Sequence, residues 1–161
     1  MIQAAWLVDI GYVVKTGAKG RFKIDYLKAQ AVLTRRFGAV RTFLFNGYAL
    51  DIPMGDGLHK FYTAMRHHGM TVCLHPMSNH AQRRVDVDLA AHLIWQAATP
   101  GVEDIVLTTG DQDFIPAVKM ARETFAKRVT LFTYRLDVSV ELQKQVDSHL
   151  YFEAVESEIS R

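Results

Sequence analysis

The chain has 161 residues, of which 49% are hydrophobic and 22% are charged. This length and composition are typical of a single globular domain with a packed core, and they exclude a disordered or fibrous protein. Nineteen Lys and Arg residues against 17 acids leave a net charge of +2, which excludes a strongly basic coat protein of nucleic acid. We therefore expect one domain over residues 1–161, with any nucleic-acid site formed by a local basic patch.

The start of the chain lacks the pattern of a signal peptide, because no basic segment precedes the first apolar run and Asp9 interrupts that run. No apolar run approaches the length that crosses a bilayer, so no membrane partner is expected and the cytoplasm is the expected compartment. The single cysteine, Cys73, lies in the apolar run of residues 71–74. It forms no internal disulfide, and we expect it to be a small buried residue.

Strands and helices are predicted to alternate along the first half of the chain. Residues 4–8 are an apolar run typical of a buried parallel strand, and Asp9 ends that run. A polar connection with two glycines is predicted over residues 13–21, before an amphipathic helix over residues 22–37 that Gly38 ends. The elements predicted next are a strand over 40–45, a turn-rich loop over 46–57, a helix over 58–68 and a strand over 71–74.

The second half continues the same alternation. The predicted elements are a polar loop over 76–84, a helix over 86–98, a strand over 105–108, a helix over 114–125, a strand over 128–132, a short helix over 139–146 and an extended segment over 149–152. Five or six strands alternating with helices predict an α/β fold of three layers, Rossmann-like, with a mostly parallel sheet and helices on both faces.

Acidic residues follow several of the predicted strands. Asp9 ends the first strand, Asp111 and Asp113 follow the fourth, and Asp86 and Asp88 open the helix after the third. Ligands of open α/β sheets bind at the carboxyl ends of the strands, so these acids meet at one edge if the first and fourth strands are adjacent. A single Asp in such a place is more often a helix cap, which remains the alternative for each acid taken alone.

Carboxylates gathered at one edge repel one another unless a cation lies between them. Mg²⁺ and Mn²⁺ prefer oxygen ligands and keep water molecules that a phosphate can replace, which suits hydrolysis of a phosphodiester. The candidate metal ligands are Asp9, Asp86, Asp88, Asp111 and Asp113.

Three short segments resemble the three motifs of the NYN domain family, a relative of the PIN-type nucleases, and are most similar to its LabA-like branch. They are Asp9 at the end of the first strand, residues 84–90 (Arg-Val-Asp-Val-Asp-Leu-Ala) and residues 109–114 (Thr-Gly-Asp-Gln-Asp-Phe). The similarity covers residues 2–152. It implies a PIN-like fold and a metal-dependent ribonuclease, with Asp9, Asp86, Asp111 and Asp113 in the catalytic positions.

The chain departs from the family pattern at two positions. Tyr12 stands where the family usually has Asn, and His92 stands where it often has an acid. His92 is four residues after Asp88, so the two share a helix face, and a local hydrogen bond is favoured there over a metal ligand. Asp88 is a candidate to replace the acid that is missing at His92.

Basic and hydroxyl side chains lie next to the acids in the sequence. Lys15, Lys19 and Arg21 are in the connection after the first strand, and Arg83 and Arg84 precede the helix of Asp86. They are candidates to contact the phosphates of a substrate, and solvated loop residues are an equally weighted alternative. Thr109 is a candidate to donate its hydroxyl to a phosphate or to a carboxylate.

Three functions fit these residues. The first is a Mg²⁺- or Mn²⁺-dependent ribonuclease acting on single-stranded or structured RNA, and the second is a non-catalytic RNA- or protein-binding module of the same fold, favoured by Tyr12 and His92. A phosphatase or phosphotransferase ranks last, because residues 9–12 lack the second Asp that such enzymes use as acid and base. The sequence leaves the oligomeric state open, a homodimer included.

Overall fold

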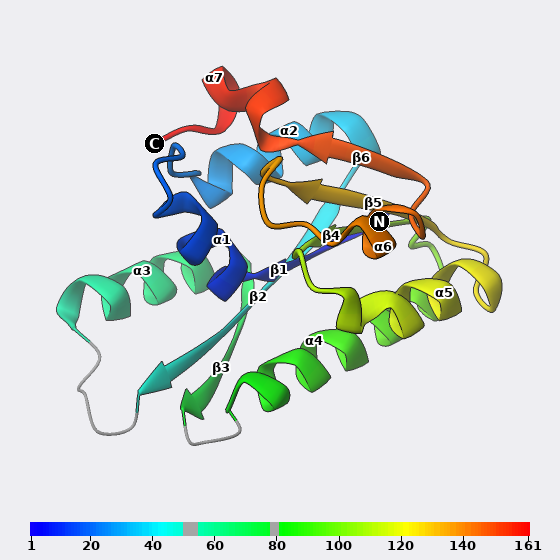
Figure 1. Cartoon of the computed structure of the whole chain (residues 1–161), viewed down its shortest axis with the longest axis horizontal. Helices are drawn as coiled ribbons and strands as arrows, with labels where there is room; N and C mark the ends of the chain where they lie inside the picture. The colour runs from blue at the N-terminus through cyan, green and yellow to red at the C-terminus, as the bar shows by residue number, and fades with distance from the viewer. Residues whose placement is uncertain (50–54, 78–80) are drawn as a thin grey trace.

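A computed structural model of the chain describes residues 1–49, 55–77 and 81–161. Its centre is a parallel sheet of six strands in the order β3-β2-β1-β4-β5-β6 (Figure 1). The strands are β1 (Ala4–Asp9), β2 (Val40–Ala49), β3 (Thr71–Met77), β4 (Asp104–Thr108), β5 (Arg128–Thr133) and β6 (Ser148–Tyr151). The expected α/β fold with a mostly parallel sheet is confirmed.

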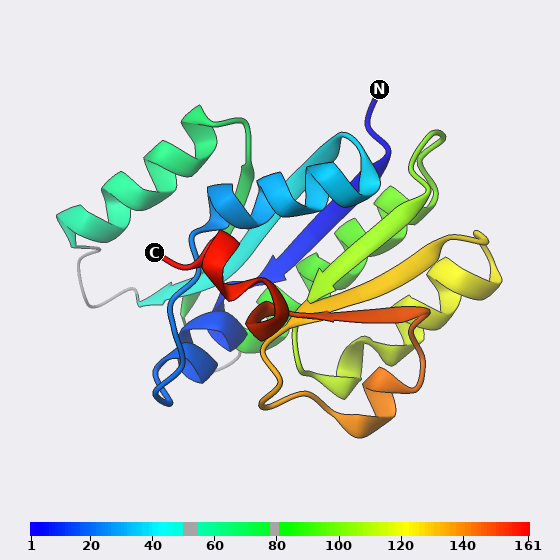
Figure 2. The same ribbon diagram turned by 90° about the horizontal axis from the view of Figure 1, so that it is seen from above.

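Helices cover both faces of this sheet, as Figure 2 shows from above. One face packs against α1 (Ile10–Gly17), α2 (Tyr26–Phe37), α3 (Asp56–His67), the 3₁₀ turn η2 (Phe152–Val155) and α7 (Glu156–Ile159). The other packs against α4 (Ala81–Ala97), the 3₁₀ turn η1 (Gln112–Phe114), α5 (Ile115–Glu123) and α6 (Val140–Gln143). Successive residues of β1 alternate between the two cores, with Trp6 and Val8 in the first and Leu7 in the second.

β1 lies in the middle of the sheet, and all six of its residues are buried. Val8 is in register with Leu44 of β2 on one side and with Thr108 of β4 on the other. The chain moves from β1 outward to β3 and then crosses back to β4, so the strand order reverses between β1 and β4. The first and fourth strands are therefore adjacent, which was the condition for the acids to meet at one edge, and ligand sites are expected at this reversal.

The prediction of a polar connection over residues 13–21 is wrong for its first part, because α1 extends from Ile10 to Gly17. Ile10, Val13 and Gly17 are buried at helical spacing against the sheet, and Asp9 caps the helix. Lys15 and the glycines lie among the buried residues, so the helical periodicity is difficult to detect in the sequence. Lys15 consequently lies on a helix that begins directly after Asp9.

The predicted loop before the helix of Asp86 is also largely wrong, because α4 already begins at Ala81 and β3 continues to Met77. Val85 is fully buried, so it extends the stripe of Leu89 and Leu93 backward by one turn. Residues 78–80 of the predicted loop lie outside the described residues. Arg83, Arg84 and Asp86 are therefore helical, and Asp86 does not open the helix.

The remaining boundaries differ by smaller amounts. The helix expected from residue 22 begins at Tyr26, with Asp25 as its cap, and the strand expected to end at residue 45 continues to Ala49. Residues 50–54 of the loop predicted over 46–57 lie outside the described residues, and α3 begins at Asp56. The last turn, α7, packs against α2 and has no counterpart among the predicted elements. No helix within residues 1–49, 55–77 and 81–161 is long and apolar enough to span a bilayer.

Candidate active site

Asp9 is held at the carboxyl end of β1 by two hydrogen bonds. The backbone N–H of Tyr12 donates to Oδ1 over 3.3 Å, and the hydroxyl of Thr109 donates to Oδ2 over 3.0 Å. Asp9 is only 6% exposed, and Thr109 is fully buried. Thr109 follows β4 directly, so the contact joins the ends of the two central strands and fixes the orientation of the carboxylate.

Asp111 and Asp113 lie on the turn that follows β4. Asp111 caps the short η1 turn, because its Oδ1 accepts the backbone N–H of Asp113 over 2.8 Å. The backbone N–H of Asp111 in turn donates to the hydroxyl of Thr109 over 3.3 Å. The expected cap is thus present at Asp111, whereas the Asp113 side chain is exposed to solvent.

The four acids of the catalytic prediction lie in two depressions. The first, of about 590 Å³, contains Asp9 and Asp111; its lining residues are Asp9, Gly11, Tyr12, Lys15, Thr16, Thr109, Gly110, Asp111 and Asp137. The second, of about 300 Å³, contains Asp86 and Asp113; its lining residues are Arg83, Asp86, Val87, Ala90, Asp113 and Phe114. Asp111 and Asp113, two residues apart, connect the two.

The electrostatics of the first depression favour a cation. Burial raises the pKa of Asp9 above its ordinary value, and the negative charge of Asp111 raises it further. The hydrogen bonds from Thr109 and Tyr12 act in the opposite direction but do not cancel the rise. A positive ion between Asp9 and Asp111 would remove this penalty, which is how clustered carboxylates are usually stabilised.

The donor set fits a hard divalent ion. Both Asp9 oxygens accept hydrogen bonds, and a carboxylate oxygen has a second lone pair that can face an ion. Mg²⁺ is typically held by one or two carboxylates with water in its other positions. Asp9 and Asp111 would be those ligands. Asp86 and Asp113 line the neighbouring depression instead.

The predicted basic residues differ in their surroundings. Lys15 lines the depression of Asp9, and Arg83 lines that of Asp86, while Arg21 and Arg84 line neither of these two depressions. All four residues are exposed. Lys19 is already paired, because its Nζ lies 2.6 Å from Oδ2 of Asp137. Of the five basic residues that the sequence predicts near the acids, Lys19 is therefore already paired with a negative charge.

Asp137 and Gly110 are two residues of this site that the sequence analysis did not single out. Asp137 lies in the loop after β5, accepts from the Thr16 hydroxyl over 3.1 Å, and Lys19 lowers its pKa below the ordinary value. A Cβ at Gly110 would overlap the backbone carbonyl of Asp137, so only glycine allows the two loops to meet. Gly110 belongs to the motif of residues 109–114, but nothing in the sequence around Asp137 indicates this contact.

Asp88 lies apart from the depressions of the other acids. Its Oδ2 is 2.7 Å from Nε2 of His75, and its Oδ1 is 2.9 Å from Nδ1 of His92. Among the residues that the structure describes, the only three metal-ligating side chains with ligand atoms all within 4.8 Å of one another are Cys73, Asp88 and His92. The predicted local hydrogen bond between His92 and Asp88 is present, and Cys73 is half-buried rather than buried.

The chain is similar to known proteins in its family and in its fold. The family model of the NYN domain matches residues 4–155. The chain belongs to the NYN domain family. NYN domains have a PIN-like nuclease fold and generally act on nucleic acids, and nucleases of this kind generally use divalent metal ions.

A solved structure has the same fold as this chain. A crystal structure of a protein of unknown function from Vibrio parahaemolyticus superimposes with a TM-score of 0.77 at 24% sequence identity, over 93% of this chain and 92% of that one. At this identity the likeness supports the fold alone. A comparison with curated protein sequences finds no match.

Proposed function

We propose that this NYN domain is a metal-dependent ribonuclease of the LabA-like branch that hydrolyses phosphodiester bonds of single-stranded or structured RNA. The observation that carries the proposal is the meeting of the buried Asp9 with Asp111 where the strand order reverses, in a depression that Lys15 also lines. Mg²⁺ or Mn²⁺ is the proposed ion, since both favour carboxylate oxygens.

Each residue of the two depressions has a role in this proposal. Asp9 and Asp111 would hold the ion, which would supply an activated water and neutralise charge on the phosphate. Thr109 and the Tyr12 backbone orient Asp9. Asp86 and Asp113 position water or a second ion in the neighbouring depression, and Lys15 and Arg83 contact phosphate oxygens.

The experiment compares cleavage of a fluorescent RNA and of a small phosphomonoester, each with Mn²⁺, with Mg²⁺ and with a chelator. We expect RNA to be cleaved only with metal and the phosphomonoester to remain intact. Asp111→Asn should lower the rate at least roughly 100-fold, as the loss of a metal-positioning group does. Glu123→Gln, at the exposed end of α5, removes a carboxylate elsewhere and should leave the rate unchanged. RNA cleavage that persists in Asp111→Asn would contradict the proposal.

A non-catalytic RNA-binding module is the second candidate, and Tyr12 favours it. Its hydroxyl donates to the carbonyl of Leu136 over 2.9 Å and its ring packs against Gly110, so this side chain braces the loop after β5. It therefore offers no polar group to the depression in place of the usual Asn. RNA binding without cleavage under any of the metal conditions above would select this candidate.

A further inference from the structure

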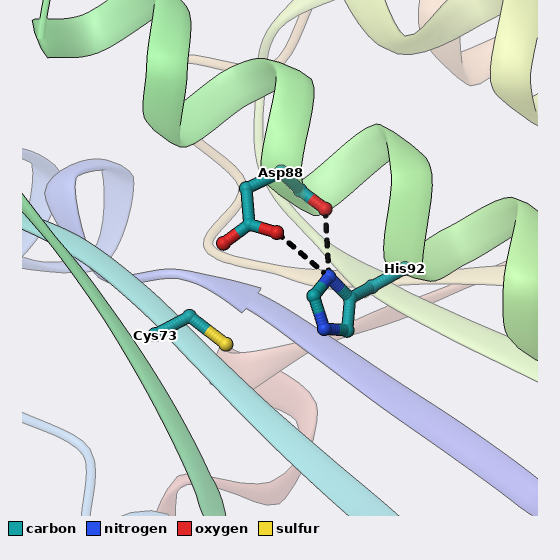
Figure 3. A group of neighbouring side chains, drawn as sticks. All are labelled: Cys73, Asp88 and His92. Carbon is teal, nitrogen blue, oxygen red and sulfur yellow. Dashed lines mark hydrogen bonds and ion pairs between the residues drawn. The ribbon is translucent and has the colours of Figure 1, made fainter.

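Four side chains capable of binding a metal gather between β3 and α4, two from each element. Cys73 and His75 are two residues apart on β3 and so point to the same face of the strand. Asp88 and His92 are four residues apart on α4 and so share one face of the helix. The two faces meet, as Figure 3 shows for Cys73, Asp88 and His92.

The distances within this cluster are short enough for one ion. One ligand atom from each of Cys73, Asp88 and His92 lies within 4.8 Å of the other two. Zn²⁺ bonds of about 2.0–2.3 Å require donor atoms roughly 3–4 Å apart, so only a small inward movement of the side chains is needed. Asp88 and His92 expose about a quarter of their side chains, at 25% and 24%, which lets an ion enter and leaves room for water.

We propose that Cys73, Asp88 and His92 bind a divalent transition-metal ion of the zinc class, with water in the fourth position. Thiolate and imidazole select Zn²⁺ and similar ions over Mg²⁺, and three protein ligands with one open position are a common zinc arrangement. None of these three residues lines the depression of Asp9 and Asp111, whose carboxylate oxygens favour a hard ion.

The groups around the three ligands support this assignment. His75 holds the second oxygen of Asp88 at 2.7 Å, and such a partner fixes the orientation of a ligating carboxylate. The ring of His92 packs against those of Phe43, Phe45 and Trp95, with centroid distances of 5.3, 5.2 and 5.7 Å. These rings form an apolar wall that restrains the imidazole and keeps competing water from one side of the ion.

The proposed ion would join β3 to α4. The hydrogen bond between His75 and Asp88 already connects these two elements, and the ion would add a second connection through Cys73. Because α4 also carries Asp86 and Arg83, the ion would hold the helix that lines the second acidic depression. Binding of the ion does not depend on whether the acidic depressions cleave RNA.

Cobalt titration of the reduced, metal-free protein tests the proposal. Co²⁺ bound to a thiolate gives a charge-transfer band in the near ultraviolet, and we expect this band to saturate at one Co²⁺ per chain. Cys73→Ser should abolish the band, and His92→Gln should weaken Co²⁺ binding at least roughly tenfold. Asp111→Asn and the exposed His59→Gln are the matched controls, and both should keep the band and the affinity.

A second measurement uses the unchanged chain and so does not depend on the folding of variants. Zn²⁺ at one equivalent should slow alkylation of Cys73 at least roughly tenfold relative to the chelator-treated protein, since a bound thiolate is shielded. Mg²⁺ at the same concentration should not slow it. No thiolate-to-cobalt band in the wild-type chain, or alkylation of Cys73 at the same rate with and without Zn²⁺, would overturn the proposal.

Discussion

Asp111 combines a structural role and a charge in one side chain. Its carboxylate caps η1 through the N–H of Asp113, and its negative charge raises the pKa of Asp9. An amide in its place would keep the cap and remove the charge, whereas a methyl group would remove both. The two substitutions therefore separate the contributions of the cap and of the charge to folding.

We predict that metal-free Asp111→Ala unfolds about 1 kcal/mol more easily than the wild type, because the cap is lost. Asp111→Asn should be as stable as the wild type or slightly more stable, since the repulsion of Asp9 disappears while the acceptor remains. Urea unfolding in the presence of a chelator measures both. Equal stability of Asp111→Ala and Asp111→Asn would show that the cap contributes nothing.

Lys15 and Lys19 should contribute unequally to RNA binding. Lys19 is paired with Asp137 at 2.6 Å and must break that pair to reach a phosphate, while Lys15 faces the depression of Asp9. Lys15→Ala should therefore weaken RNA binding and reduce the salt slope by about 0.7, and Lys19→Ala should change both less. Fluorescence anisotropy against KCl, in an Asp111→Asn background that prevents cleavage, gives the values.

Asp137→Asn is the reciprocal change, because it removes the negative charge that pairs with Lys19. RNA affinity should rise in this variant and fall again when Lys19→Ala is added. A greater loss of affinity in Lys19→Ala than in Lys15→Ala would contradict this assignment.

At the scale of elements, the helical start of α4 separates the two arginines that the sequence treated as one pair. Consecutive residues of a helix point about 100° apart, and Arg83, not Arg84, lines the depression of Asp86 and Asp113. Arg83 and Arg84 therefore have equal charge but different positions, since Arg83 lines the depression and Arg84 does not. Each serves as a control for the other.

Arg83→Ala should weaken binding of all RNA sequences alike and make the salt slope shallower by about 0.7, the share of one phosphate contact. Arg84→Ala, its neighbour with the same charge, should have a smaller effect on both. Folding stability should change little in either variant, because exposed charges contribute little to it. Anisotropy titrations at several KCl concentrations measure the slopes, and equal losses from both variants would refute the geometric distinction.

The contact between the turn after β4 and the loop after β5 depends on Gly110. A Cβ there would overlap the carbonyl of Asp137 and approach the ring of Tyr12 to 3.1 Å. Gly110→Ala should therefore lower the free energy of unfolding by about 1–3 kcal/mol, the usual cost of overpacking. Gly57→Ala on α3, where a Cβ meets no atom within 4 Å, is the control and should be neutral or stabilising. Thermal or urea unfolding of both variants measures the difference.

At the scale of the whole molecule, the two proposed sites differ in the ions that they would bind and in the sheet regions that they join. Asp9 and Asp111 lie at the ends of β1 and β4, while the cluster of Cys73, Asp88 and His92 lies between β3 and α4. An ion that binds only the folded state stabilises it by mass action.

We predict that Mn²⁺ raises the melting temperature of the wild type and of Cys73→Ser, and that Asp111→Asn removes most of this rise. At a concentration 100 times Kd, the gain is about 2.7 kcal/mol of unfolding free energy. Differential scanning fluorimetry with Mn²⁺ and with a chelator measures it. An unchanged Mn²⁺ response in Asp111→Asn would show that Asp9 and Asp111 do not share an ion.

The sequence by itself determined the fold class and which acids are candidates for the site. Buried parallel strands are continuous apolar runs, and their ends are marked by polar residues, so Asp9 after residues 4–8 and Asp111 after residues 105–108 could be assigned to strand ends. The NYN motifs pointed to the same residues. The starts of α1 and α4 were predicted less accurately, because glycine and basic residues interrupt the hydrophobic periodicity there.

Only the tertiary structure decided which of the candidates meet. Hydrophobic periodicity shows which side of a helix is buried, but it does not say which residues of another element lie opposite. The strand order and the packing of α4 on β3 decide how the acids are grouped. Asp9 lies with Asp111 and Asp86 lies with Asp113, whereas Asp88 contacts His75 and His92. The contact of Asp88 with His92 is local, and its helical spacing predicted it. The other contacts join different elements of the chain, so no local pattern could reveal them.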